Sequence, residues 1–349
     1  GILVLACSSA AAIPSEPTPN IDATVEARVA QERAVDATVE ARLREEKASP
    51  ATVQAQPTNA PAPMSTPRPI ATATPAPAPI PTSVPIPTFE ILPKHPTLDC
   101  LNTQFQMFVE VFGLYVVAPS SAPEEYVTHS ANVLAQYIDN DADGLPDDSA
   151  VLEHLQRENV LVPVWEMSTR EQFNQARRRT KCEDGVTPVA SMYYDEDQWA
   201  IGGIESTGKW DTNLEEIWHI VSIGWYATYP EFFGDEPSKQ SKLVDAMDFA
   251  RGARFFAVPD KYPDNAWYSY YDDTCDYGCQ LHEYFYWITM ANIDALDSAL
   301  TSKCAESSDE RSICNRTELE KLDLLAFGLL NNHGFNLPTS LPNGRYRVD

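Results

Sequence analysis

Basic residues, glycine and long apolar runs are all scarce in this sequence. Lys and Arg total 25 against 51 Asp and Glu, so the formal net charge is −26. Such a charge excludes a nucleic acid or an anionic membrane surface as an electrostatically held partner. With 14 Gly against 28 Pro, a collagen repeat is excluded. The G-x-G-x-x-G, Walker and G-x-S-x-G patterns are absent too, which removes the commonest nucleotide-binding and serine-hydrolase interpretations.

The first residues read as the end of an export signal. Residues 2–6 are apolar but too short to span a bilayer. Together with Cys7 and the two serines after it, they resemble the lipobox of bacterial lipoproteins. The resemblance implies a truncated signal peptide at 1–6, a lipidated Cys7, and an extracytoplasmic protein anchored through lipid to a bacterial cell membrane or cell surface. The alternative is an ordinary truncated signal peptide with an incidental cysteine.

Three polar segments follow before the composition becomes that of a folded domain. A lipid-anchored start at 7–19 leads into 20–47, where Asp-Ala-Thr-Val-Glu-Ala-Arg occurs twice at an offset of two heptads. This repeat predicts a charged helix or a weak coiled coil, which offers a weak route to oligomers. Residues 48–98 are rich in Pro, Ala and Thr, which favours extended polyproline II structure. We therefore predict a disordered stalk there.

Residues 99–349 have the composition of one folded domain. Apolar residues recur at helical spacing in seven stretches: 124–138, 149–158, 168–179, 212–228, 240–253, 280–299 and 316–331. Runs rich in Val, Tyr, Trp and Ile predict strands at 108–117, 161–166, 186–194 and 198–204. Because the strands precede most of the helices, we predict a single α+β domain in which a small sheet is followed by helices.

Six cysteines remain once Cys7 is set aside as the lipid site. An even number fits disulfides in an exported protein. Short separations in the sequence predict the two pairs Cys275–Cys279 and Cys304–Cys314. The remaining two cysteines then form the predicted pair Cys100–Cys182. The alternative is a zinc knuckle built on Cys275, Cys279 and His282, but a fourth ligand at matching spacing is missing.

An aspartate-rich loop lies at 139–150. Its carboxylates fall at alternate positions, and Gly144 at the sixth position permits a sharp turn, as in the looser calcium-binding loops of extracellular modules. The predicted Ca2+ ligands are four side chains and one carbonyl: Asp139, Asp141, Asp143, Leu145 and Asp147. Ala150 stands where an EF-hand has a bidentate Glu, so Asp148 or Glu153 would substitute. The alternative is a solvated acidic turn that caps the next helix.

The helix predicted at 212–228 carries the spacing of metal ligands. Glu215 and His219 stand four residues apart and therefore share one helix face. Zincins use this spacing in H-E-x-x-H, where two ligands enclose a Glu that acts as general base. Here Glu215 replaces the first histidine, and Glu216 occupies the position of the base. The alternative is a capping box from Thr212 to Glu215, with His219 as an ordinary core residue.

Glu283, in an aromatic stretch at 282–287, is the candidate third ligand. Strands, a helix with ligand spacing and a later Glu-bearing helix resemble the order in glutamate-ligand, anthrax lethal-factor-like metallopeptidases. This resemblance implies a zincin-like fold, bound zinc or another divalent metal, and a protein or peptide substrate. Two carboxylates beside one imidazole weaken the metal as a Lewis acid. Two functions therefore stay open: a calcium-binding metallohydrolase, active or degenerate, and a non-enzymatic calcium-dependent binding or adhesion module on a lipidated stalk.

Replacing the predicted lipid site tests the anchor. In the full-length precursor, Cys7→Ser is expected to move the protein from the membrane fraction to the soluble fraction, because the attached lipid is the predicted membrane contact. Cell fractionation followed by immunoblotting measures the distribution. Retention of the variant in the membrane fraction would contradict the lipobox interpretation.

Overall fold

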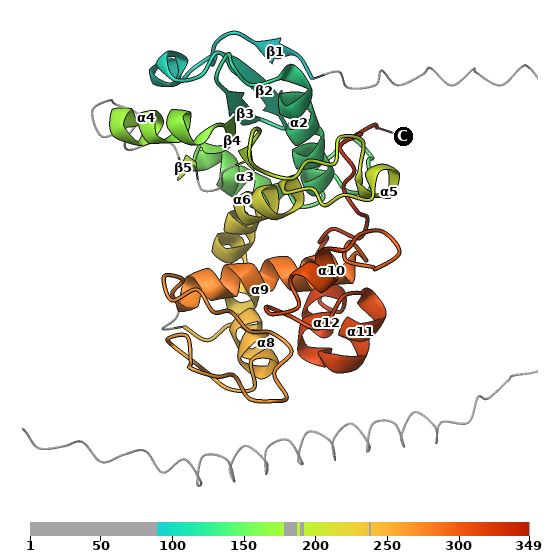
Figure 1. Cartoon of the computed structure of the whole chain (residues 1–349). Coiled ribbons are helices and arrows are strands. Elements are labelled where there is room, and N and C mark those ends of the chain that lie inside the picture. Colours follow the sequence, from blue (N-terminus) through green and yellow to red (C-terminus); the bar gives the residue numbers. More distant parts are fainter. Residues whose placement is uncertain (1–88, 178–186, 189–191, 237–238, 349) are drawn as a thin grey trace, which may run out of the picture. The chain divides into compact units, whose positions relative to one another are not determined.

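A computed structural model describes residues 89–177, 187–188, 192–236 and 239–348 (Figure 1). The predicted signal peptide, the predicted lipid site Cys7, the predicted charged helix and most of the predicted stalk lie outside these residues. Within them, the prediction of one α+β domain with a small sheet followed by helices is confirmed. A search of the described helices for one long and apolar enough to cross a membrane finds none.

The sheet mixes antiparallel and parallel pairing. Its strands are β1 (Ile91–Leu92), β2 (Met107–Val111), β3 (Leu114–Ala118), β4 (Val160–Trp165), β5 (Thr187–Pro188) and β6 (Met192–Tyr193). The order is β1-β2-β3-β4-β5, and β6 also pairs with β4. The first three strands are antiparallel neighbours, whereas β3, β5 and β6 each run parallel to β4. Parallel pairing of β3 with β4 requires a crossover, which two helices provide.

The strand predicted at 108–117 is a hairpin. Phe112 and Gly113 both have positive φ, 49° and 77°, and form a two-residue turn between β2 and β3. Turns of this kind match the twist of antiparallel strands. The ordered domain also starts before the predicted boundary at 99, because β1 pairs with β2.

The strand predicted at 198–204 is absent from the described chain. Its second half contains Gly202 and Gly203 with φ of 89° and 97°, values that an extended strand does not have. A Cβ at Gly203 would also approach Asn343 to 2.8 Å. The segment therefore forms turns that lead into a short helix.

Every predicted helical stretch contains a helix. The helices of the described chain are η1 (Asp99–Thr103), α2 (Glu124–Ile138), α3 (Ser149–Arg157), α4 (Met167–Arg177), α5 (Ile204–Thr207), α6 (Asn213–Thr228), α7 (Pro230–Phe233), α8 (Lys242–Ala250), α9 (Tyr277–Asn292), α10 (Lys303–Glu306), α11 (Arg316–Leu322) and α12 (Leu324–Asn331). The stretch at 316–331 is split because Asp323 ends α11 and caps α12, where its side chain accepts a hydrogen bond from the Ala326 amide.

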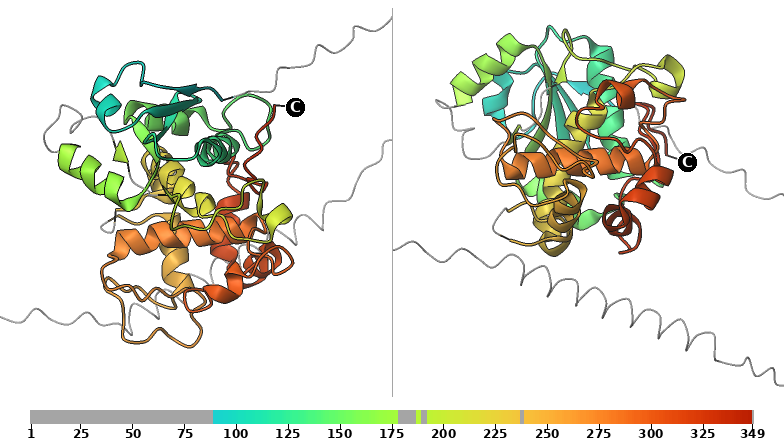
Figure 2. Two further views of the ribbon diagram at one scale, coloured as in Figure 1. Left: turned by 45° about the horizontal axis from the view of Figure 1, so that its top comes forward. Right: turned by 60° about the horizontal axis from the view of Figure 1, so that its bottom comes forward.

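Helices cover both faces of the sheet. Val109, Val116 and Val162 alternate with their neighbours and point to the side of α2, α3 and α6. The opposite face packs on Phe105, which follows η1, and on Phe173 of α4. Figure 2 shows α6 between this α/β part and α9, with α8, α11 and α12 on the far side of α9. The core is thus continuous from the sheet through α6 to the C-terminal helices.

Two of the three predicted disulfides are confirmed. Cys275 bonds to Cys279 at the start of α9, and Cys304 of α10 bonds to Cys314. Because these sulfurs are bonded to each other, the zinc-knuckle alternative is excluded. The pairing of Cys100 with Cys182 stays a prediction, since Cys182 lies outside the described residues.

The position of α6 depends on a close approach to α3. A Cβ at Gly224 would lie 2.6 Å from a Val151 methyl carbon and 2.9 Å from the Val151 carbonyl oxygen. The second of these atoms belongs to the backbone of a packed helix, so it cannot move aside alone. Glycine at this point lets α6 lie directly on α3.

Substitution of this glycine tests the close packing. Gly224→Ala is expected to lower the free energy of unfolding by about 1–3 kcal/mol through overpacking, measured by urea denaturation. Gly328→Ala in α12 is the matched control, because its Cβ would meet only the Asn332 amide at 3.6 Å. The control is expected to stabilise by about 0.5–1 kcal/mol, as Ala does in an unobstructed helix. Equal effects of both variants would contradict the packing argument.

Candidate metal centres

The seam between α6 and α9 brings together the predicted ligands of the first candidate centre. Trp218 of α6 is fully buried, and its ring lies 5.1 Å from that of Phe285 of α9, centroid to centroid. The next residue on α6 is His219, and two residues before Phe285 stands Glu283. Packing of the two aromatic rings therefore holds the two polar side chains at the edge of the seam.

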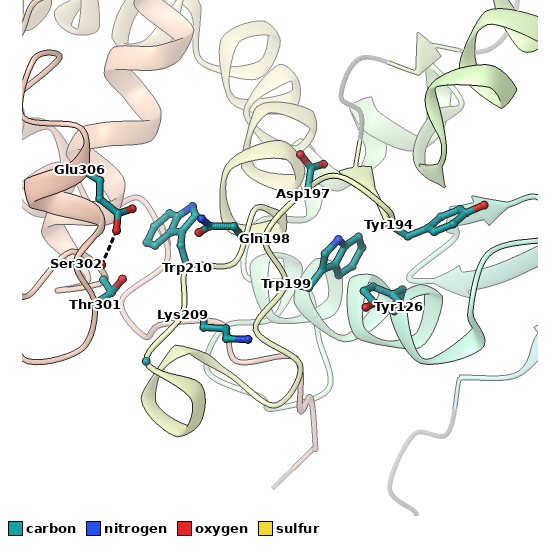
Figure 3. A pocket seen from close by; sticks show the side chains of 11 residues that line it. Tyr126, Tyr194, Asp197, Gln198, Trp199, Lys209, Trp210, Thr301, Ser302 and Glu306 are labelled. Atoms are coloured by element: carbon teal, nitrogen blue, oxygen red, sulfur yellow. Dashed lines mark hydrogen bonds between the residues drawn. The ribbon is translucent and has the colours of Figure 1, made fainter.

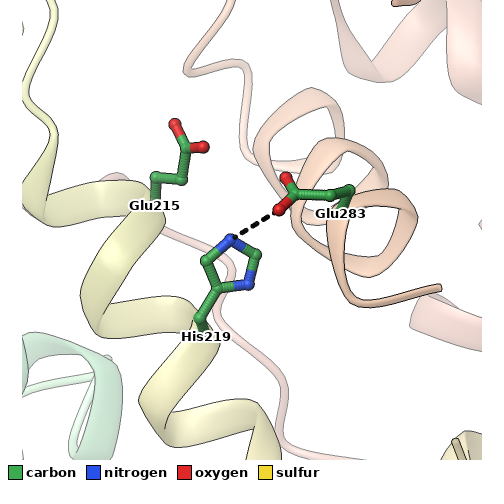
Figure 4. A group of neighbouring side chains, drawn as sticks. All are labelled: Glu215, His219 and Glu283. Atoms are coloured by element: carbon green, nitrogen blue, oxygen red, sulfur yellow. Dashed lines mark ion pairs between the residues drawn. The ribbon is translucent and has the colours of Figure 1, made fainter. Parts of the chain in front are cut away.

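Glu215, His219 and Glu283 converge (Figure 4). Each offers one ligand atom, and these atoms all lie within 4.8 Å of one another. His219 Nε2 is 3.5 Å from Glu283 Oε1, and both side chains are 17% exposed. The group is thus mostly desolvated but still reachable from solvent. We call it the seam site.

The capping-box interpretation of Glu215 is wrong. Thr212 makes no side-chain cap, and Asp211 instead accepts a hydrogen bond from the Asn213 amide. The Glu215 carboxylate faces the Tyr286 hydroxyl of α9, which lowers the pKa of the carboxyl against the larger effect of burial. Glu215 therefore points into the seam rather than back to the helix start.

Carboxylates crowd the seam site. Burial, together with the charges of Glu215, Glu310 and Glu216, raises the pKa of Glu283 to about 9, and Lys303 opposes the shift. Burial also raises the pKa of Glu215 and of Glu310. Glu216, the candidate base, is half-buried and is not among the converging ligand atoms, but its charge contributes to the raised pKa of Glu283. Several carboxyl groups in one desolvated place repel each other when ionised, and a bound cation relieves that repulsion.

His219 is held in its neutral form. Burial, and after it the charge of His282, lowers the pKa of His219 to about 3. A neutral imidazole keeps a lone pair that can bind a metal ion. His282 itself faces away, because its Nε2 pairs with Asp235 at 3.0 Å. One imidazole nitrogen and two carboxylates therefore make a donor set that fits a divalent metal ion.

The aspartate loop at 139–150 folds as the sequence pattern requires. Asp139 is fully buried and its oxygens accept hydrogen bonds from the amides of Asp143 and Gly144. Asp143 accepts from the Leu145 amide, and Gly144 has φ of 87°. Carboxylate oxygens of Asp139, Asp141 and Asp147 lie within 4.8 Å of one another. Three of the four predicted carboxylate ligands therefore form one group.

The other residues predicted to bind calcium lie outside this group of three carboxylates. The Leu145 side chain is exposed. Asp148, offered as a substitute ligand, caps α3 by accepting from the amides of Ala150 and Val151. The second substitute, Glu153, is exposed on α3. The capping role is thus real, but it belongs to Asp148 and leaves the carboxylate group intact.

The C-terminal segment covers the loop, which sequence reasoning missed. The Tyr346 hydroxyl donates a hydrogen bond to Asp139, and Asn140 Oδ1 accepts from the amides of Thr339 and Ser340 at 2.8 Å each.

Burial, and repulsion by Asp139 and other loop carboxylates, raises the pKa of Asp147 to about 6. Sequence separations of about 200 residues leave no local signal for such contacts.

No protein family, curated protein or solved structure matches this chain. The case for function therefore depends on the chemistry of the two groups of side chains.

Proposed function

We propose that the protein is an extracytoplasmic, lipid-anchored and calcium-stabilised metallohydrolase with a zincin-like domain, whose metal ion is held by the seam site. The observation that carries this proposal is the convergence of Glu215 and His219 of α6 with Glu283 of α9. These residues come from two helices and meet in a partly exposed, carboxylate-rich place, as ligands of a catalytic metal do.

The side chains divide the chemistry among themselves. Glu215, His219 and Glu283 would hold the ion, which when bound supplies Lewis-acid polarisation of a substrate carbonyl and of a water molecule. Glu216 accepts the proton of the attacking water as general base, since it follows a ligand on the same helix and is half-buried beside the site. The Tyr286 hydroxyl lies near the Glu215 carboxylate and lowers the pKa of that carboxyl.

The donor set also bears on the identity of the ion. Two carboxylates with one imidazole suit a harder ion such as Mn2+ better than they suit zinc. A peptide bond is the proposed substrate group, and its support is the resemblance to glutamate-ligand metallopeptidases together with the position of Glu216.

A non-enzymatic binding or adhesion module is the second candidate. It is favoured by the direct approach of His219 Nε2 to Glu283 Oε1, 3.5 Å apart, because two polar side chains that lie against each other in a seam can have a structural role alone. If the protein is such a binding or adhesion module, the seam site has a structural role, and calcium at the aspartate loop still stabilises the domain.

Replacing the general base separates the two candidates. Glu216→Gln is expected to lower peptide hydrolysis, measured with fluorescein-labelled casein in the presence of Mn2+ or Zn2+, by about 10²- to 10⁴-fold. Metal binding, measured by isothermal titration calorimetry, should remain, because no ligand is lost. His219→Ala should lose both hydrolysis and the binding event at the seam site, while binding at the aspartate loop remains, and Glu205→Gln, at an exposed position of α5, should change neither. Absence of metal binding by the unaltered chain would reject the hydrolase proposal.

Calcium is expected to stabilise the domain through the aspartate loop. A ligand bound only by the folded state adds about 2.7 kcal/mol at a hundredfold excess over Kd, which is about 5–10 °C in Tm for a domain of this size. Differential scanning calorimetry with and without Ca2+ measures the shift. Asp141→Ala should remove most of it, whereas Asp260→Ala, an exposed aspartate elsewhere, should retain it. An unchanged Tm at millimolar Ca2+ would contradict calcium binding, and the loop would then be interpreted as an acidic turn that caps the next helix.

A further inference from the structure

An open groove of about 530 Å³ lies beside the N-terminal end of α6 (Figure 3). Its walls come from α2, from the segment after β6, from the loop before α6, and from residues 301–306 around α10. None of its lining residues belongs to the seam site or to the aspartate loop. The volume falls within the range of small-molecule sites.

One side of the groove is a fixed aromatic wall. Trp199 and Tyr126 pack edge to face with centroids 4.5 Å apart and planes at 85°. The Trp199 indole nitrogen donates a hydrogen bond to the Tyr193 carbonyl, and the Tyr194 hydroxyl donates one to Ser121. Each of the three lining rings is half-buried, so part of each remains accessible. Rings held in this way bind at a low entropic cost.

Trp210 adds a fourth aromatic ring to the lining of the groove. Its side chain lines the groove and is 3% exposed, and its indole nitrogen finds no hydrogen-bond partner in the described part of the chain. The Lys303 ammonium group lies 5.5 Å from the centroid of the Trp210 ring, which fixes the ring from another side. The indole nitrogen is itself buried, so Trp210 contributes its ring, and not its N–H, to the lining of the groove.

Planar polar side chains complete the groove. In Figure 3, Gln198 lies between Trp210 and Trp199, and Asp197 stands near it. The charged groups are Asp197, Glu306 and Lys209, so carboxylates outnumber cations and an acidic ligand is disfavoured. The Gln198 carbonyl already accepts a hydrogen bond from the Thr212 amide at 2.9 Å. This carbonyl is therefore not free to pair with a peptide bound as an added strand.

We propose that this groove binds a neutral saccharide made of pyranose rings with equatorial hydroxyls. The C–H face of such a ring carries partial positive charge and packs on the negative face of an aromatic ring. Its hydroxyls both donate and accept, so they match the Gln198 side-chain amide and the Asp197 carboxylate at the same time. The proposal stands on the groove alone and needs neither metal site.

Ligand titration of the full chain tests the site. The probes are cellotetraose and triacetylchitotriose, added to the chain carrying Cys7→Ser and labelled with 5-fluorotryptophan. The ¹⁹F NMR spectrum contains seven Trp signals, and the variants Trp199→Phe and Trp210→Phe assign two of them. The signals of Trp199 and Trp210 are expected to shift, and the shift is expected to saturate, on titration with at least one probe. Isothermal titration calorimetry gives the Kd.

Two groove variants and one control make the result specific. Trp199→Ala and Gln198→Ala are each expected to weaken saccharide binding at least tenfold. Gln198 is exposed, so its replacement should leave the fold intact even where Trp199→Ala does not. Phe249→Ala removes a 55% exposed ring on α8 and should leave Kd unchanged.

Three outcomes would overturn the proposal. The first is the absence of saturable binding of either probe to the folded chain up to about 10 mM, far above the Kd of a specific site. The second is an unchanged Kd in both groove variants, which would place the saccharide elsewhere. The third is tighter binding of trigalacturonic acid or of trialanine than of the neutral probes, which would assign the groove to acidic glycans or to peptides.

Discussion

The burial of Trp218 between α2 and α9 is the contact on which the arrangement of the domain depends. Its ring lies 5.4 Å from Tyr137 of α2 and 5.1 Å from Phe285 of α9, centroid to centroid. The contact therefore links the α/β part to the C-terminal helices through α6. Gly224, one and a half turns further on, lets the same helix lie directly on α3. Because α6 is fixed at both points, the His219 side chain points into the seam between α6 and α9.

A cluster of carboxyl groups at such a seam opposes folding unless cations accompany it. The chain provides two cations of its own. Lys303 lowers the pKa of Glu283, and Arg311, buried with its guanidinium carbon 4.0 Å from the centroid of the Trp287 ring, lowers the negative potential near Glu215. Burial is the first cause of the raised pKa of Glu283, and repulsion by Glu215, Glu310 and Glu216 adds to it. The convergence of carboxylates in a mostly desolvated seam is the physical argument for a metal ion there.

Local sequence patterns predicted much of this domain. They failed where contacts between segments distant in the sequence determine the structure. The bounds 124–138 of α2 follow from apolar spacing after Pro123, and Glu215 with His219 follows from i, i+4 geometry. The turn at Phe112 and Gly113 was missed because an aromatic residue with positive φ is rare there. The groove could not be predicted from sequence, since its walls come from segments up to about 180 residues apart.

The aspartate loop and the seam site are joined by a short path through α2. Asp139 ends that helix, and two residues earlier the Tyr137 hydroxyl donates a hydrogen bond of 2.8 Å to the Leu214 carbonyl. Leu214 precedes Glu215 in the first turn of α6. The fold of the loop therefore restrains the end of α2, and through Tyr137 the end of α2 is joined to the turn that carries Glu215. In this view the C-terminal segment, held to Asp139 by Tyr346, closes over the loop and completes the support.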